Sequence, residues 1–174
     1  NLSLSFGGVK ALQDVSFRVP ENTVTTIIGP NGAGKTSLFN CISGFYKPQQ
    51  GTIHYQGQPL PGSIKPPKRA AMGLARTFQN IALFRGMTVL DNIKLGGHTR
   101  LNTSVWQALR YFGAAQKAEL ELRREIEEQV IDFLEIDHIR KYPITMLPYG
   151  LQKRVELGRA LAMRPRVLLL DEPV

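Results

Sequence analysis

Residues 23–40 read TVTTIIGPNGAGKTSLFN, and the fold predicted for the rest of the chain depends on this stretch. Its first six residues are all β-branched, which is typical of a buried strand, and the residues after the glycines are suited to begin a helix. Gly29, Gly34, Lys35 and Thr36 match the spacing of a phosphate-binding loop, G-x-x-x-x-G-K-[ST]. The stretch therefore predicts a strand, a loop and a helix that bind a nucleotide.

The spacing has a physical reason. Glycines allow the backbone to approach an anion closely, so we expect the N–H groups of residues 31–36 to surround the β-phosphate at the positive end of a helix dipole. The Lys35 ammonium would contact the β- and γ-phosphate oxygens, and the Thr36 hydroxyl could coordinate Mg²⁺. A glycine-rich turn without a ligand is the alternative. The predicted phosphate-site residues are Asn31, Gly32, Ala33, Gly34, Lys35, Thr36 and Ser37.

The composition limits the class of protein. The chain has 174 residues, 43% of them hydrophobic, and no apolar run near membrane-spanning length, which predicts a soluble domain. A single cysteine, Cys41, favours a reducing compartment such as the cytosol. The net charge of +8 permits nucleic acid or an anionic membrane as partner. However, the densest basic groups, residues 65–69 and 164–166, are short and lack aromatic residues, so we expect a solvated face and no nucleic acid.

Besides residues 23–28, two strands are expected before the loop, and residues 51–55 and 73–79 are expected to form strands after it. Residues 2–6 and 11–19 read as a hairpin that turns at Gly7-Gly8, and Phe6 is either a core residue or a platform for an adenine ring. The helix after the loop should end at Gly44, and residues 58–67 should form a surface loop. Residues 73–79 read as a strand whose final residue, Gln79, binds Mg²⁺, orients water or forms an ordinary loop hydrogen bond.

The middle of the chain has a helical pattern. Thr88 and Asp91 are plausible caps of a short helix, and residues 115–135 read as the longest helix. The apolar face predicted for that helix consists of Leu122, Ile126, Val130, Phe133 and Leu134. We expect residues 85–147 to form a helical subdomain inserted into an α/β nucleotide-binding core made of residues 1–84 and 148–174.

The last segment places two acids at the end of a strand. Residues 147–152 read LPYGLQ and precede a helix, after which residues 166–170 form an apolar run suited to a buried parallel strand. Asp171 and Glu172 follow at its carboxyl end, where ligands bind in open α/β sheets.

These motifs together resemble the ATP-binding subunits of ABC transporters. The phosphate loop, Gln79, the signature-like residues 147–152 and the acidic strand end occur in that family's order, over nearly the whole chain. The sequence ARTFQNIALF at residues 75–84, the sequence MTVLDN at residues 87–92 and Tyr149 resemble the branched-chain amino acid import type. The resemblance implies a P-loop NTPase fold, with a mostly parallel sheet flanked by helices and an antiparallel β part at its N-terminus.

The resemblance also implies roles for residues at matching positions. Phe6 would stack on adenine, Asp171 would hold Mg²⁺ through water, and Glu172 would be the general base. Gln79 would join Mg²⁺ to the interface with the membrane subunit. Pro148, Tyr149 and Gly150 would meet the γ-phosphate held by a second subunit. The implied unit is a Mg²⁺-dependent ATPase, a head-to-tail dimer with two ATP molecules, bound to transmembrane permease subunits on the inner face of the plasma membrane.

Two departures leave alternatives open. The usual signature has Ser-Gly-Gly where this chain has Pro148-Tyr149-Gly150, so a serine contact to the γ-phosphate is lost, which we interpret as a subtype feature. The chain also stops soon after Glu172, before the family's switch histidine, so we expect a piece of a longer protein. The rival functions are a fragment that binds nucleotide without hydrolysis, a non-transport ABC-type ATPase, and a P-loop kinase or GTPase, in which the signature-like segment would have no purpose.

Overall fold

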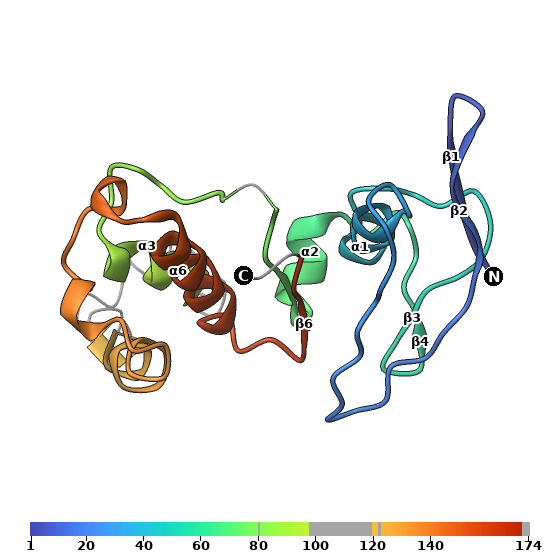
Figure 1. The fold of residues 1–174 in the computed structure, drawn as a ribbon. Coiled ribbons are helices and arrows are strands. Elements are labelled where there is room, and N and C mark those ends of the chain that lie inside the picture. The colour runs from blue at the N-terminus through green and yellow to red at the C-terminus, as the bar shows by residue number, and fades with distance from the viewer. Residues whose placement is uncertain (80, 98–119, 122, 172–174) are drawn as a thin grey trace. The chain divides into compact units, whose positions relative to one another are not determined.

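The computed structural model describes residues 1–79, 81–97, 120–121 and 123–171, which are drawn in colour in Figure 1. The chain divides into two compact units, Asn1–Met72 and Gly73–Val174. Each unit has a hydrophobic core of its own, and each is described by itself.

The first unit begins with the predicted hairpin. Strand β1 (Leu2–Phe6) pairs antiparallel with β2 (Val9–Val15), and Phe6 lies opposite Val9. Gly7 and Gly8 both have positive φ angles, 49° and 91°. A two-residue turn of this kind has the twist that antiparallel strands need, and glycine adopts it without steric cost. The hairpin prediction is therefore confirmed, although β2 begins and ends earlier than expected.

Helix α1 (Lys35–Ser43) follows the glycine-rich loop, as predicted. It buries Leu38 and Cys41 in a core shared with apolar side chains of the hairpin. Gly44 ends the helix in the left-handed conformation with a φ of 85°, which glycine adopts easily. Burial raises the pKa of the Cys41 thiol, so this side chain behaves as a small core residue.

The strand predicted over residues 23–28 is wrong. These residues adopt no regular secondary structure, and the side chains of Val24 and Ile28 are 97% and 90% exposed. β-branched residues favour an extended backbone, but a strand exists only where another strand pairs with it. Within the first unit, no described segment pairs with residues 23–28.

The region expected to be a loop contains regular structure. Strand β3 (His54–Tyr55) pairs antiparallel with β4 (Gln58–Pro59), and helix α2 (Pro66–Ala71) follows. Two prolines occupy the first turn of α2, where a missing N–H group costs nothing. Pro66 and Pro67, which helped to predict a loop, therefore start a short helix.

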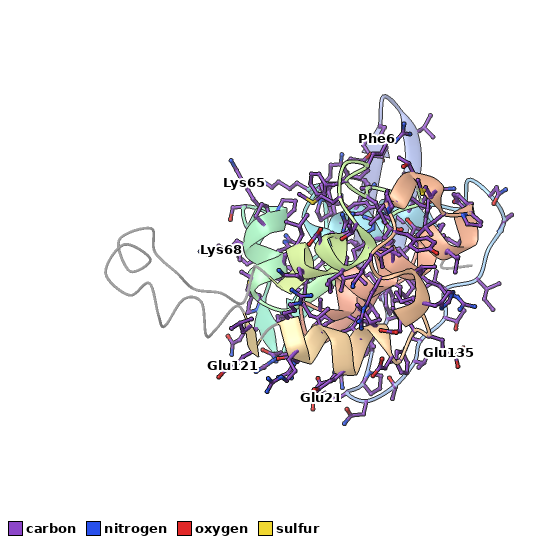
Figure 2. All side chains as sticks on the ribbon, turned by 90° about the vertical axis from the view of Figure 1, so that its left-hand side faces the viewer. Phe6, Glu21, Lys65, Lys68, Glu121 and Glu135 are labelled. Carbon is purple, nitrogen blue, oxygen red and sulfur yellow. The ribbon has the colours of Figure 1, made fainter. Side chains whose placement is uncertain are left out.

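Arg69 on α2 is 1% exposed, and its partners within the described part of the chain are backbone carbonyl groups. Its guanidinium donates to the carbonyl oxygens of Cys41 and Ile42 at the end of α1, at 2.9 and 2.7 Å, and to those of Pro61 and Ile64, each at 2.9 Å. Burial lowers the pKa of Arg69, and the neighbouring Cys41 has a smaller, opposite effect. Arg69 thus caps the helix that follows the phosphate loop, since the last carbonyls of a helix lack partners within it. By contrast, the nearby Lys65 and Lys68 are exposed (Figure 2).

The second unit combines a parallel strand pair with helices (Figure 1). Strand β5 (Leu74–Arg76) pairs with β6 (Val167–Leu169), and Arg76 lies opposite Leu169. Helices α3 (Val89–Gly97) and α6 (Tyr149–Leu161) pack closely, and short helical turns η3 (Asp137–Ile139) and η4 (Ile144–Met146) complete the unit. A Cβ atom on Gly96 would lie 1.9 Å from the Arg159 carbonyl oxygen, so the approach of α3 to α6 requires glycine there.

The helical predictions in this unit are confirmed in part. The Thr88 hydroxyl accepts from the Asp91 backbone N–H at 3.2 Å and donates to the Asp91 carboxylate at 2.7 Å, as expected of a capped helix start. The predicted long helix becomes a π-helix, η2 (Ile126–Ile131), and then a turn. Ile126, Val130 and Leu134 are buried as predicted, but Phe133 is 73% exposed because the helix ends before it. Leu122 lies outside the described residues.

We expect Arg69→Met to lower the free energy of unfolding by about 3 kcal/mol, because four carbonyl groups lose a charged donor. Lys68→Met is the matched control, since that side chain is exposed on the same helix, and its effect should stay within about 0.5 kcal/mol. Urea denaturation followed by circular dichroism would measure both values. Equal, small losses for the two variants would contradict the capping role of Arg69.

Candidate functional site

The phosphate loop has the backbone conformation that its sequence predicts. Gly32 and Gly34 have φ angles of 83° and 87°, in the left-handed region. A Cβ atom on Gly34 would lie 2.2 Å from the Ala11 carbonyl oxygen, so both the conformation and the space require glycine at this position. The Ala33 N–H donates to the Pro30 carbonyl at 3.2 Å and closes a turn inside the loop.

The N-terminus of α1 is suited to an anion. No side chain caps it, and its first turn contains no acidic residue. Unpaired N–H groups and the helix dipole give such an end a partial positive charge. Asn31, Gly32, Ala33 and Thr36 are exposed, whereas Ser37 is partly buried. The exposed Thr36 hydroxyl at this end is an oxygen ligand of the kind that Mg²⁺ accepts.

Lys35 is partly buried and closes the loop. Its ammonium donates to the carbonyl oxygens of Gly29 at 2.6 Å and Pro30 at 2.9 Å. Both acceptors are neutral, so no carboxylate cancels the charge through these bonds. The positive charge is thereby held beside the same loop whose backbone N–H groups would bind a phosphate.

Phe6 is half-exposed at the end of β1 beside the hairpin turn, as Figure 2 shows. Its ring contacts that of Tyr46 edge to face, with centroids 5.1 Å apart and planes at 70°. Phe6 is therefore not a core residue, and its stacking on a base stays a prediction.

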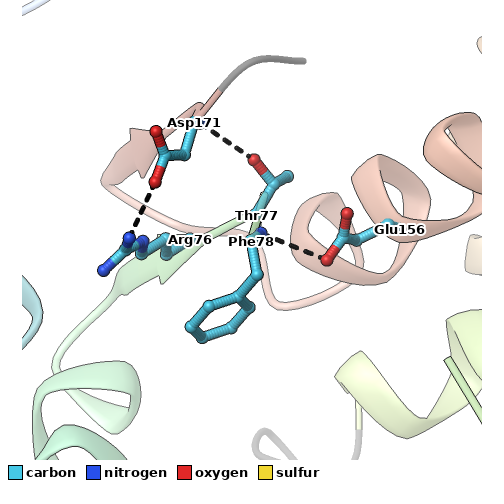
Figure 3. A network of polar contacts seen from close by, with 5 residues as sticks. All are labelled: Arg76, Thr77, Phe78, Glu156 and Asp171. Carbon is cyan, nitrogen blue, oxygen red and sulfur yellow. Dashed lines mark hydrogen bonds and ion pairs between the residues drawn. The ribbon is translucent and has the colours of Figure 1, made fainter. Parts of the chain in front are cut away.

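In the second unit, Asp171 is buried beside the end of β5 (Figure 3). Its carboxylate forms an ion pair with the Arg76 guanidinium at 2.8 Å, and both side chains are 6% exposed. Its backbone N–H donates to the Thr77 hydroxyl at 3.2 Å, and the Thr77 N–H donates to the Leu169 carbonyl at 3.0 Å. These bonds fix Asp171 at the carboxyl edge of the parallel pair, where the sequence predicted it.

Gln79 belongs to the same edge of this pair, because it follows β5 by three residues while Asp171 follows β6 by two. The Gln79 side chain is exposed. Glu172 lies outside the described residues, so its predicted role is untested. Asp171 and Gln79 thus lie at the same edge of a strand pair in the second unit, whereas the phosphate loop and Thr36 lie in the first unit.

The signature-like segment begins α6. Pro148 occupies the N-cap position, no side chain caps the helix, and its first turn contains no acidic residue. Tyr149 is 63% exposed, Gly150 has open space at its Cβ position, and the Gln152 amide donates to the Leu147 carbonyl at 2.8 Å. The second unit thereby also has an accessible helix end suited to an anion, at the residues where the signature resemblance placed one.

Comparison with known proteins identifies the family. The ABC transporter family profile matches residues 12–174. The chain belongs to the ABC transporter ATP-binding family. This confirms the assignment made from the phosphate loop, Gln79, the signature-like segment and the acidic strand end.

The relatives and solved structures agree with this ABC assignment. The chain is 39% identical to the high-affinity branched-chain amino acid transport ATP-binding protein BraF of Pseudomonas aeruginosa, covering 99% of this chain and 67% of BraF. It is 37% identical to LivG of Escherichia coli K12, which carries the same description, over the same shares of both chains. A solved ATP-binding cassette of an ABC transporter in its ADP conformation superposes with a TM-score of 0.80 at 35% identity, covering 100% of this chain and 67% of that one.

The predicted α/β P-loop NTPase fold of this ABC chain is therefore confirmed. The described residues contribute one parallel pair, β5 and β6, and two antiparallel pairs to it. No helix among residues 1–79, 81–97, 120–121 and 123–171 is long and apolar enough to cross a bilayer. In the same ranges, no group of three or more His, Cys, Asp or Glu side chains could hold a metal ion by itself.

Near the end of β5 in this ABC chain, two buried charged side chains were missed from sequence. Arg76 pairs with Asp171, and the Glu156 carboxylate accepts from the Phe78 backbone N–H at 3.1 Å. Glu156 had a usable signal, because it is an acidic residue inside the largely apolar run 155–161. Arg76 had a weaker one, since it follows the apolar Leu74 and Ala75 within a buried strand.

We expect Arg76→Met to destabilise the chain by about 3 kcal/mol, because it leaves the Asp171 carboxylate buried without its cation. The double variant Arg76→Met/Asp171→Leu replaces the pair with apolar side chains and should recover most of that loss. Chemical denaturation of the three proteins would measure the difference. A double variant as unstable as the single one would show that the ion pair is not the cause.

Proposed function

We propose that this chain is the ATP-hydrolysing part of an importer for branched-chain amino acids. The observation that carries the proposal is the exposed, uncapped N-terminus of α1 with the Lys35 ammonium held against the glycine-rich loop. The substrate class rests on the similarity to BraF and LivG, which are branched-chain amino acid transport ATP-binding proteins. ATP is the expected ligand of the loop.

The chemistry follows from the charges placed around the phosphates. Backbone N–H groups of residues 31–37 and the Lys35 ammonium would stabilise the negative charge that develops on the β- and γ-phosphate oxygens. Thr36, Gln79 and Asp171 would hold Mg²⁺, which supplies further charge neutralisation when bound. Glu172 would orient the attacking water and accept its proton. Phe6 would stack on the adenine ring.

Two copies, or this chain and a similar one, would complete the site. The exposed α6 N-terminus at Pro148, Tyr149 and Gly150 is suited to contact the γ-phosphate bound by the partner's loop. In a head-to-tail dimer, each of the two ATP molecules would contact the α1 N-terminus of one subunit and the α6 N-terminus of the other. Pro148 stands where a serine hydroxyl would otherwise contact phosphate, so the contact here would come from the backbone N–H groups of the residues after it.

Transport also requires membrane partners. We propose that residues 85–147 form the inserted helical subdomain and that residues 1–84 and 148–174 belong to the nucleotide-binding core. Closure of the dimer on ATP would move this subdomain against transmembrane permease subunits, with the chain peripheral on the inner face of the plasma membrane.

We expect Lys35→Met to weaken Mg-ATP binding by at least about 10-fold, since it removes a charge held at the phosphate loop. Lys10→Met is the matched control, because Lys10 is exposed on β2 and should leave the affinity within about 2-fold. Isothermal titration calorimetry would give both affinities. Equal affinities in Lys35→Met and the wild type would contradict ATP binding at this loop.

We expect Glu172→Gln to lower phosphate release by at least about 100-fold while the ATP affinity stays within about 3-fold, because only the base is removed. A phosphate-release assay beside the same titration measures both quantities in the full-length chain. Binding without any phosphate release by the wild type would favour the alternative of a nucleotide-binding module. Hydrolysis that persists without permease subunits and responds to DNA or ribosomes would favour a non-transport ATPase.

A further inference from the structure

Helix α6 holds the segment that contains Gln79 at two points. The Glu156 carboxylate accepts from the Phe78 backbone N–H at 3.1 Å (Figure 3), and the Arg159 guanidinium donates to the Ala82 carbonyl. The two side chains are three residues apart, so they lie on one face of the helix. Gln79 therefore lies between two backbone positions that the same helix fixes.

Burying the Glu156 carboxylate to make this contact costs free energy. Its side chain is 1% exposed, and the second carboxylate oxygen, Oε2, has no hydrogen-bond partner in the part of the chain that the structure describes. Burying a carboxylate costs several kcal/mol unless partners compensate for the lost water. An apolar side chain at this position would avoid that cost but would leave the Phe78 N–H without an acceptor. The energetic cost argues for a role beyond packing.

The opposite charge of Arg159 reduces this cost in part. Burial lowers the pKa of Arg159, and the Glu156 carboxylate has a smaller effect in the opposite direction. The two residues thus interact electrostatically while each binds a different backbone group of residues 78–82. The other side of this segment is fixed by β6, through the bond from the Thr77 N–H to the Leu169 carbonyl.

We infer that Glu156 is a positioning residue, which acts through the Phe78 backbone to hold Gln79 in place relative to α6. The inference rests on the proposed function, which gives Gln79 its role at the nucleotide. Because α6 begins at the signature-like residues 148–150, a shift of this helix on contact with a partner's phosphate moves the Gln79 segment with it. The two sites are coupled because one 13-residue helix, α6, begins at the signature-like residues and also carries Glu156.

The direct test is hydrogen exchange at the Phe78 amide in the full-length chain, measured by NMR. Glu156→Met removes the acceptor and should speed exchange at this amide by at least about 10-fold, whereas Glu156→Gln keeps a carbonyl acceptor and should stay within about 3-fold. Glu128→Met, an identical change at an exposed position, is the matched control and should have no effect. Unchanged exchange in Glu156→Met would overturn the inference.

A double-mutant cycle then tests whether Glu156 acts through Gln79. Glu156→Met should lower Mg-ATP turnover by about 10-fold in the wild-type background but by less than about 2-fold in Gln79→Ala. Equal factors in the two backgrounds would show a merely structural role and overturn the inference. If Glu156→Met does not fold, Arg159→Met takes its place in the cycle, with the same two outcomes.

The two proposals fail separately. A wild-type chain that binds and hydrolyses no ATP refutes the proposed function, while the exchange measurement still decides whether Glu156 holds the Phe78 amide. A chain with normal turnover and no dependence of that amide on Glu156 refutes the positioning role alone.

Discussion

A charged side chain in a protein interior needs hydrogen-bond partners, and in this chain such side chains find them on segments that carry the predicted site. Arg69 binds the last carbonyls of α1, the helix that follows the phosphate loop. Arg76 binds the Asp171 carboxylate, and Glu156 binds the backbone beside Gln79. Apolar packing forms both cores, but these polar contacts determine where the functional segments lie within each unit.

The second common feature is a pair of helices whose first turns have neither a capping side chain nor an acidic residue. Helices usually begin with such a cap, because the first N–H groups lack partners within the helix. In α1 and α6 these groups stay accessible at the two segments that the motifs identified. Both ends are suited to an anion, since no side-chain cap competes for their N–H groups.

Sequence predicted best where the signal is local. The phosphate loop, the Gly7-Gly8 turn, the Gly44 cap and the Thr88 cap each depend on a few neighbouring residues, and all four appear in the structure. The strand predicted over residues 23–28 is wrong because a strand needs a second strand to pair with, which the composition of the segment does not reveal. The predicted burial of Phe133 is wrong because η2 departs from the 3.6-residue period and the helix then ends. The partners of Arg69 and Glu156 come from distant residues, so only the structure could show them.

Buried anchors lie beside exposed side chains on the segments that carry the predicted site residues. Arg69 and Glu156 are almost fully buried, whereas Thr36, Gln79 and Tyr149 are exposed on the segments that these two side chains hold. Buried anchors restrict the backbone, so the exposed side chains lose little further conformational entropy when a ligand binds. Preorganised groups stabilise developing charge more effectively than mobile ones, because they need no reorganisation during the reaction. The costly burial of charge in this chain is therefore consistent with a site that must hold its geometry while its contact groups stay open to phosphate.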